Sequence, residues 1–250
     1  MFIEWSFVIS SVTLISAEWK ADRIVGGHSA VPWQASLLKN RNHYCDAVIY
    51  SDEIVITAAH CIPVNENTIV TIRVGSFECH SAGQVVNVSK IKIHEHFTRS
   101  LSNDIAVIRL NSSLQMGVNV MSIPLADISP QHGSTASISG WEDGVCNKPG
   151  FRTLLEKPVV IVDCQKSYGK STPRNMICAA SLKKDFCSAD TGGPLVSGGK
   201  LVGIDSLGIG CTNKNYPGIY VNVAVLKPWI LKAIKKVSLP GRGKVFKAGL

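Results

Sequence analysis

Three short segments of the chain carry residue types that could together perform nucleophilic chemistry. His60 ends the run Ile54-Val-Ile-Thr-Ala-Ala-His60-Cys61, and a carboxylate, Asp104, lies in Asn103-Asp104-Ile105-Ala106-Val107. A hydroxyl group, that of Thr191, lies in Cys187-Ser188-Ala189-Asp190-Thr191-Gly192-Gly193-Pro194. A hydroxyl becomes a nucleophile when a neighbouring base takes its proton. Because the segments are far apart in the sequence, this chemistry depends on a fold that brings them together.

These segments resemble, in the same order, those of the chymotrypsin and trypsin family of serine proteases (family S1). Ile24-Val25-Gly26-Gly27 resembles the mature N-terminus of these enzymes. The resemblance runs from Ile24 to Val237 and is closest to mite trypsin-like group 3 allergens and the inactivated protease paralogues of scabies mites. It implies an all-β fold of two packed six-stranded antiparallel β-barrels, chymotrypsin-like, with a C-terminal helix.

The resemblance implies that His60 is the general base and that Asp104 orients it, with Thr191 at the position of the nucleophilic serine. The family carries Gly-Asp-Ser-Gly-Gly-Pro there, so Ala189 replaces a glycine and Thr191 replaces the serine. A β-methyl group restricts χ1 and takes space needed by the histidine ring or by the approaching carbonyl. We therefore expect a misplaced hydroxyl, and a misplacement of about 1 Å can cost roughly a hundredfold in rate.

The oxyanion hole implied by the resemblance uses the backbone N–H groups of Ala189 and Thr191. Glycine permits backbone angles that a Cβ atom penalises, so Ala189 could turn its peptide away from the oxyanion. Losing one such donor typically costs about a hundredfold to a thousandfold. The alternative is that alanine is accommodated and the hole stays intact.

Asp185 has the spacing of the carboxylate at the base of a trypsin specificity pocket, which implies cleavage after Lys or Arg. Phe186 stands where a small residue is usual, and its ring could fill that pocket. Leu207 replaces the tryptophan that in the family forms a wall for the extended substrate. Asp46-Ala47 replaces the Gly-Gly that usually follows the first cysteine of the histidine-loop pair. Each change alone could be neutral drift. The full set of expected pocket residues is Asp185, Phe186, Ser206, Leu207, Gly208 and Gly218.

The apolar run before Ala17 predicts a signal peptide over residues 1–17, although a buried N-terminal strand is the alternative. The run is too short to span a bilayer, so we expect a secreted, extracellular protein. Residues 18–23 would then be a pro-segment. Cleavage after Arg23 would free the Ile24 amine, which Asp190 receives in the family's activation ion pair. The protease-like domain covers 24–237, and a basic tail covers 238–250.

Eight cysteines in an exported chain predict disulfides. The resemblance implies the pairs Cys45 with Cys61, Cys164 with Cys178, and Cys187 with Cys211. Cys79 and Cys146 remain, and we predict a fourth bridge between them because their loops are neighbours in the family fold. A metal site is the rival interpretation, but the sequence has no Cys-x-x-Cys or His-x-x-His spacing, so we expect no metal and no cofactor.

Short apolar or alternating runs predict an all-β architecture. One segment, Val225 to Val237, has a helical period, with lysines on the face opposite its apolar side chains. The predicted strands are Thr68 to Val74, Val85 to Ile93, Ile105 to Leu110, Thr135 to Gly140, Pro158 to Val162, Lys200 to Ser206 and Gly218 to Val223.

The net charge of +8 and the isoelectric point near 9.1 favour anionic partners, although such charge commonly serves solubility alone. Arg242, Lys244 and Lys247 make a heparin-like polyanion a candidate ligand. Nucleic acid and membrane partners are not expected, and we expect a monomer. Asn87-Val-Ser89 and Asn111-Ser-Ser113 fit the glycosylation sequon.

Taken together, these residues predict a serine protease homologue that has lost efficient peptide hydrolysis and acts by binding. The resemblance to the inactivated mite paralogues implies interference with host defence through a host protein, either a complement component or a protease. The rival hypothesis is a slow endopeptidase with a threonine nucleophile and trypsin-like specificity. A third hypothesis is a basic surface binder.

Overall fold

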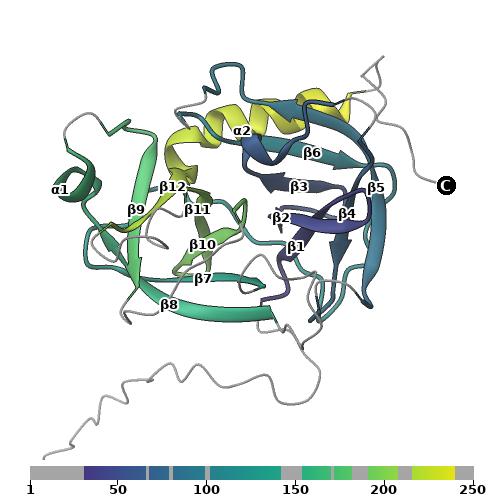
Figure 1. Cartoon of the computed structure of the whole chain (residues 1–250), viewed down its shortest axis with the longest axis horizontal. Helices are drawn as coiled ribbons and strands as arrows, with labels where there is room; N and C mark the ends of the chain where they lie inside the picture. The colour runs from purple at the N-terminus through teal and green to yellow at the C-terminus, as the bar shows by residue number, and fades with distance from the viewer. Residues whose placement is uncertain are drawn as a thin grey trace, which may run out of the picture.

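The computed structural model of the chain describes residues 31–65, 68–78, 81–98, 102–141, 154–169, 172–181, 191–207 and 216–239. Within these residues the chain forms two closed six-stranded barrels, which lie side by side (Figure 1). Every strand pairing is antiparallel. The predicted fold class is confirmed.

The first barrel closes in the strand order β1, β2, β3, β6, β5, β4. Strand β3 is buried at all four positions and β6 at all but Arg109, so their apolar residues run almost continuously instead of alternating. The strands are β1 (Gln34–Lys39), β2 (Asn42–Ile49), β3 (Ile54–Thr57), β4 (Val70–Val74), β5 (Gln84–Ile93) and β6 (Ala106–Leu110), with a short 3-10 turn, η1 (Ala59–Cys61), after β3.

The second barrel closes in the order β10, β11, β12, β9, β8, β7. A short helix, α1 (Cys164–Tyr168), precedes β9 and is capped by the Asp163 side chain, which accepts a hydrogen bond from the Gln165 N–H. The strands are β7 (Thr135–Trp141), β8 (Leu154–Val162), β9 (Met176–Ser181), β10 (Pro194–Ser197), β11 (Lys200–Leu207) and β12 (Gly218–Asn222).

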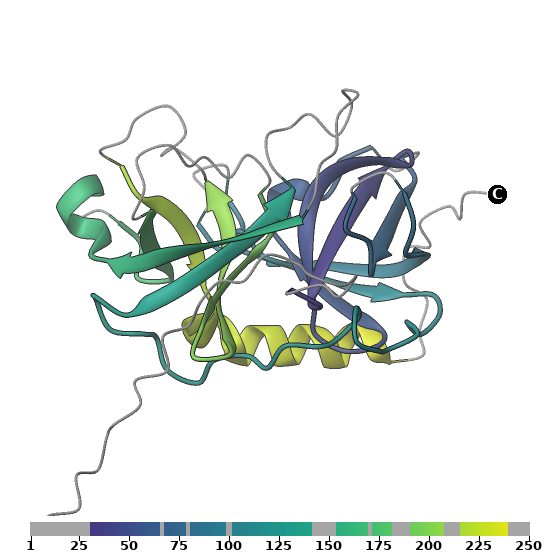
Figure 2. The same ribbon diagram turned by 90° about the horizontal axis from the view of Figure 1, so that it is seen from below.

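Helix α2 (Val223–Ser238) follows β12 directly and runs along one side of the molecule beneath both barrels (Figure 2). Asn222 caps its first turn by accepting a hydrogen bond from the Val225 N–H. The side chains of Leu226, Ile230 and Val237 enter the core of the first barrel. The predicted helix is confirmed and begins two residues earlier than its apolar period, because the capping asparagine sets the start.

The seven predicted strands all overlap observed strands, but five further strands are absent from that list: β1, β2, β3, β9 and β10. Strand β1 is buried at five consecutive positions, so it has no alternation to detect. The β1–β2 hairpin turns at Asn40 and Arg41, both at positive φ, without a glycine. Tertiary burial rather than local pattern therefore defines these strands.

Two of the predicted disulfides are confirmed, Cys45–Cys61 and Cys164–Cys178. The other two predicted pairs, Cys187 with Cys211 and Cys79 with Cys146, lie outside the described residues. In the part of the chain that is described, no helix is long and apolar enough to span a membrane.

Candidate active site

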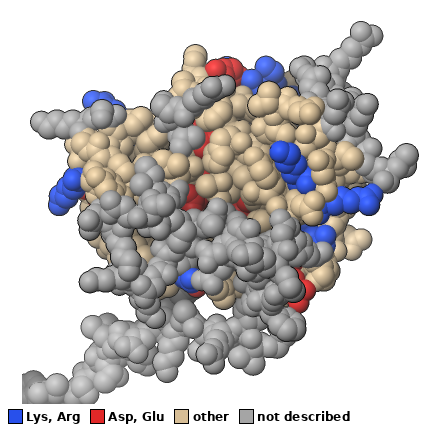
Figure 3. All heavy atoms as spheres, in the orientation of Figure 1, with Lys and Arg blue, Asp and Glu red and all other residues tan. Residues whose placement is uncertain are grey.

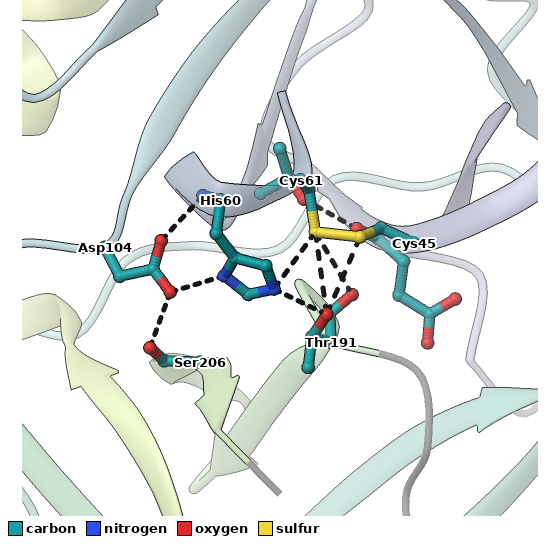
Figure 4. A network of polar contacts seen from close by, with 8 residues as sticks. Cys45, His60, Cys61, Asp104, Thr191 and Ser206 are labelled. Carbon is teal, nitrogen blue, oxygen red and sulfur yellow. Dashed lines mark hydrogen bonds and ion pairs between the residues drawn. A yellow bond between two sulfur atoms is a disulfide. The ribbon is translucent and has the colours of Figure 1, made fainter. Parts of the chain in front are cut away.

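His60 and Asp104 are both supplied by the first barrel. His60 lies in the η1 turn after β3, and Asp104 comes two residues before β6, which pairs with β3. The Asp104 side chain is fully buried and accepts two hydrogen bonds from His60, one from the backbone N–H at 2.9 Å and one at Nδ1 at 2.6 Å. These bonds fix the imidazole orientation and leave Nε2 directed away from the carboxylate (Figure 4).

Ser206 completes the surroundings of the carboxylate from the second barrel. It is buried in β11, and its hydroxyl donates to Asp104 Oδ2 at 2.6 Å. The sequence predicts Ser206 as a pocket residue, but no local pattern signals its bond to Asp104. The buried carboxylate therefore accepts three hydrogen bonds drawn from both barrels.

Thr191 lies three residues before β10, and its hydroxyl faces the histidine. The distance from Thr191 Oγ1 to His60 Nε2 is 2.9 Å, within ordinary hydrogen-bond length. The expectation that the β-methyl group displaces the hydroxyl from the histidine is therefore wrong. The χ1 angle that threonine adopts here places Oγ1 toward the ring, so the methyl group must occupy another staggered position on Cβ.

The Cys45–Cys61 disulfide forms the wall behind the threonine hydroxyl. Its two sulfur atoms lie 3.6 and 3.7 Å from Thr191 Oγ1. Both sulfurs and a ring nitrogen of His60 lie within 4.8 Å of one another, which is close enough to suggest a metal site. The sulfurs are bonded to each other, however, and a metal requires thiolates, so this group offers one imidazole and no cysteine ligand.

The segment from Thr191 to Gly193 joins the two barrels through its backbone. The Asp46 N–H of β2 donates to the Thr191 carbonyl at 2.8 Å, while Gly192 N–H donates to the Asp205 carbonyl of β11 at 2.8 Å. The Asp205 N–H in turn donates to the Gly193 carbonyl at 2.9 Å. The position of the threonine hydroxyl thus depends on both barrels, and Asp46 contributes to it through its backbone.

Gly192 is required by this junction. Its φ is +91°, and a Cβ atom built there would lie 2.3 Å from the Asp46 carbonyl oxygen and 2.4 Å from Thr57 Oγ1. The Thr57 hydroxyl donates to that same carbonyl at 2.7 Å. The two strands of the first barrel therefore leave room beside Thr191 for a glycine only.

A second network holds the loop before Asp104. Asn103 has a φ of 55°, and its side chain donates to the His96 carbonyl at 3.1 Å. Its Oδ1 accepts from Asn175 Nδ2, just before β9, at 2.7 Å. No local pattern signals this contact, because Asn103 and Asn175 are 72 residues apart. The asparagines tie the loop that presents Asp104 to the second barrel.

Of the expected pocket residues, Leu207 and Gly218 are also described. Leu207 packs against the Cys164, Cys178 and Ile219 cluster, and a Cβ at Gly218 would lie 3.0 Å from the Tyr220 ring. Burial, followed by the charge of Asp205, raises the pKa of Tyr220 well above its usual value, so this phenol stays neutral.

The remaining expected site residues lie outside the described part: Arg23, Ile24, Asp185, Phe186, Ala189, Asp190 and Gly208.

The face seen in Figure 3 carries charge of both signs. Acidic atoms show in the middle of this face and also at its edge, and most of the described Lys and Arg side chains lie to either side of the middle (Figure 3). Chemically, the described groups form a continuous path from a hydroxyl through an imidazole to a buried carboxylate. This path can take a proton from Thr191 and hold the resulting imidazolium, which is the first requirement of acyl transfer.

Two closed β-barrels with a hydroxyl, a histidine and a buried aspartate between them define a protein of the serine-protease class. The family model named Trypsin matches residues 24–230. The chain is 42% identical over 222 residues to trypsin delta of Drosophila erecta, covering 84% of this chain and 88% of that one. It is 41% identical over 228 residues to trypsin alpha-4 of Lucilia cuprina, covering 86% and 89%. The chain belongs to the trypsin family.

A solved structure gives the same result for the fold. Neuropsin, a serine protease expressed in the limbic system of mouse brain, superimposes with a TM-score of 0.71 at 31% identity. The match covers 82% of this chain and 95% of neuropsin. The two-barrel scaffold is therefore that of a serine protease.

Proposed function

We propose that this chain is a secreted trypsin-family homologue in which peptide hydrolysis is strongly impaired and which acts by binding another protein. The observation that carries the proposal is the threonine at the position of the nucleophile. The hydroxyl is in place, so the impairment concerns what happens when it attacks rather than whether it can lose its proton.

The surroundings of Thr191 explain why attack would be slow. Its hydroxyl is held between His60 Nε2, at 2.9 Å, and the disulfide sulfurs, at 3.6 and 3.7 Å. A serine hydroxyl can swing from the histidine toward a carbonyl carbon by a χ1 rotation, but in threonine that rotation also moves the methyl group. The new bond, and the ester that follows, would form on a secondary oxygen beside this methyl group. Crowding of this kind opposes the close alignment that attack requires.

Two substitutions outside the described residues support the proposal from the sequence. Ala189 replaces the glycine whose N–H contributes to the oxyanion hole in the family, and Phe186 follows the pocket aspartate Asp185. A lost oxyanion donor and a filled pocket would each reduce hydrolysis without disturbing the described triad geometry. Their effects would multiply with that of Thr191.

A second candidate function is favoured by the intact proton path. With His60 at 2.6 Å from Asp104 and at 2.9 Å from Thr191, the general base is assembled. The chain could then be a slow endopeptidase with a threonine nucleophile. The carboxylate of Asp185 would direct it to cleave after Lys or Arg, as the named trypsins among its relatives suggest.

The proposed partner comes from the resemblance to inactivated mite paralogues rather than from a contact in this structure. It is a host defence protein, either a complement component or a protease. A binding function and a hydrolytic one make different demands on His60. If the chain inhibits complement-dependent lysis by binding, the His60→Ala variant should inhibit as well as the unmodified chain.

The deciding experiment compares the mature chain from Ile24 with its Thr191→Ser variant on Lys and Arg ester and peptide substrates. We expect barely detectable hydrolysis by the unmodified chain and an increase of about a hundredfold in kcat/KM for Thr191→Ser. Adding Ala189→Gly and Phe186→Ser should raise kcat/KM further, and His60→Ala in the serine background should remove the gain. Efficient hydrolysis by the unmodified chain that His60→Ala abolishes would overturn the proposal in favour of the second candidate.

A further inference from the structure

Two segments of the first barrel fit the sequon that directs attachment of an oligosaccharide to an asparagine side chain, Asn87-Val-Ser89 and Asn111-Ser-Ser113. The structure brings them side by side, because the Asn111 N–H donates to the Asn87 carbonyl at 2.9 Å. Neighbouring strands lie only about 5 Å apart, so two such bulky groups would crowd each other on these asparagines. The surroundings of each sequon therefore decide which one can carry the group.

The Asn111 sequon projects from the surface between two anchored leucines. Leu110 and Leu114 are buried in the core of the first barrel, and their N–H groups donate to the carbonyls of the two residues before β3, at 2.9 and 2.7 Å. The three residues between these leucines, 111–113, are all exposed. The anchors hold the backbone on both sides, so a group attached to Asn111 would displace no buried contact.

The amide group of Asn111 is available at its nitrogen. The Ser112 hydroxyl donates to Asn111 Oδ1 at 3.3 Å, which engages the oxygen of the amide. In the part of the chain that the structure describes, no hydrogen bond uses Asn111 Nδ2, the atom that would carry the oligosaccharide. The third residue of the sequon, Ser113, makes one long hydrogen bond, at 3.4 Å to Glu53 Oε1. The fold therefore makes little use of these side chains.

The Asn87 sequon, in contrast, is built into the sheet. Asn87 is half-buried in the middle of β5 and pairs with Thr71 of β4, which is buried. Ser89 lies at a bulge in β5, and its hydroxyl donates to the carbonyls of Arg109 and Leu110, at 3.0 and 2.9 Å. A bulge disrupts the ladder of backbone hydrogen bonds, and this serine supplies a donor there. The serine of this sequon therefore has a structural role of its own.

We propose that Asn111 is a site of N-linked glycosylation and that Asn87 is left unmodified. The donor in this reaction is an oligosaccharide linked to a polyprenyl diphosphate. A bond forms between Asn111 Nδ2 and the anomeric carbon of the first sugar, and the amide loses one proton to a base of the transferase. The bond from that carbon to the diphosphate breaks, and the polyprenyl diphosphate leaves. The proposal rests on the secretion proposed above, because the donor and its transferase belong to the secretory pathway.

A glycan on Asn111 would leave the active site uncovered. Asp104 lies two residues before β6 and Asn111 follows its last residue, so the two lie at opposite ends of the strand. At about 3.3 Å per residue, the distance between them is roughly 20 Å. The glycan would shield the end of the first barrel that is remote from His60. A protein partner would therefore have to bind another face of the molecule.

The test expresses the full chain with its own leader in cultured mammalian cells and examines the protein in the medium. Intact mass before and after an amidase that removes N-linked glycans should show one glycan, and peptide mapping should place the resulting aspartate at position 111. Asn111→Gln should remove the whole mass of the glycan. Ser113→Ala should also remove it without changing the asparagine, whereas Ser113→Thr should retain it, because the sequon accepts either hydroxyl residue.

The matched control is Asn87→Gln, which should leave the glycan in place. A glycan on Asn87, alone or beside one on Asn111, would overturn the proposal, and so would secreted protein without a glycan. The deglycosylated chain and Asn111→Gln should unfold at the same temperature, which shows that the substitution removes the glycan and not the fold.

A failure of the proposed function gives a different result. Retention of the chain inside the cell would count against secretion alone. A chain whose leader is replaced by an established signal peptide should then still be modified at Asn111, and its export without a glycan would overturn the proposal. Efficient peptide hydrolysis by the unmodified chain would leave the proposal standing, because Asn111 lies away from Thr191.

Discussion

The two sides of the site are held in different ways. On the histidine side, the His60–Asp104 pair is held by hydrogen bonds to a buried carboxylate in the protein interior. On the threonine side, the segment around Thr191 is held by hydrogen bonds of its backbone. Asp104 is fully buried and its carboxylate accepts three hydrogen bonds. Thr191 is partly exposed, and among the described residues the polar contacts of its hydroxyl are with His60 and the two sulfurs of the disulfide. Removing a side chain from the His60–Asp104 pair should therefore lower the stability of the fold. Changing the Thr191 side chain should alter only the chemistry.

This difference limits what an intact His60–Asp104 pair can say about catalysis. A buried carboxylate is expensive unless donors surround it, and here two donors come from His60 and one from Ser206. The pair would therefore have a structural reason to persist even in a protease homologue that had lost its activity. The threonine carries no comparable structural demand, so its identity is the more direct indicator of activity.

The largest loss of stability is expected at Gly192, where the backbone next to Thr191 meets the strands of the first barrel. Gly192→Ala places a Cβ 2.3 Å from the Asp46 carbonyl and demands a φ of +91°, so we expect a loss of about 4 kcal/mol in the free energy of unfolding. The control is Gly133→Ala, which has a φ of +88° but nothing within 4 Å of the added atom. It should cost only about 1 kcal/mol. Equal losses in urea denaturation would mean that backbone strain, not the close approach of the strands, governs Gly192.

A smaller loss of stability is expected for Asp104→Ala, and its comparison with Thr191→Ala tests the two sides of the site directly. Asp104→Ala leaves the His60 N–H and the Ser206 hydroxyl without their acceptor in a buried place, so we expect a loss of about 2–3 kcal/mol. Thr191→Ala removes a hydroxyl from a partly exposed position and should cost less than about 1 kcal/mol. Denaturant titration of both variants at neutral pH measures the difference. A destabilisation by Thr191→Ala as large as that by Asp104→Ala would contradict the distinction between the two sides.

The sequence predicts the parts of this molecule that depend on short motifs and misses those that depend on contacts between distant residues. His60, Asp104 and Thr191 are found from their flanking residues, and two disulfides from the same resemblance. The bond from Ser206 to Asp104 spans 102 residues and crosses between barrels. No local pattern encodes such a bond.

The prediction about Thr191 itself failed in an instructive way. A β-branched side chain has few χ1 states, and steric reasoning from the sequence favours a displaced hydroxyl. In the structure, one of those states satisfies the bond to His60 at 2.9 Å. The backbone bond from Asp46 to Thr191 fixes where that state points, and a sequence motif does not contain this information.

The smallest effect lies away from the site, where Glu95 links the first barrel to α2. Hydrogen bonds from Lys92 and Trp229 lower the pKa of Glu95 to about 2. Because the folded-state pKa lies below the unfolded value, the ionised carboxylate stabilises the fold above about pH 4.5. That stabilisation is lost as the pH falls toward 2. Glu95 is half exposed, so solvent screening should hold its contribution below about 1 kcal/mol.

Thermal unfolding from pH 6 to pH 2 should show a shallower decline for Glu95→Gln than for the unmodified chain. Parallel declines would show that this exposed link contributes nothing measurable to the stability of the fold.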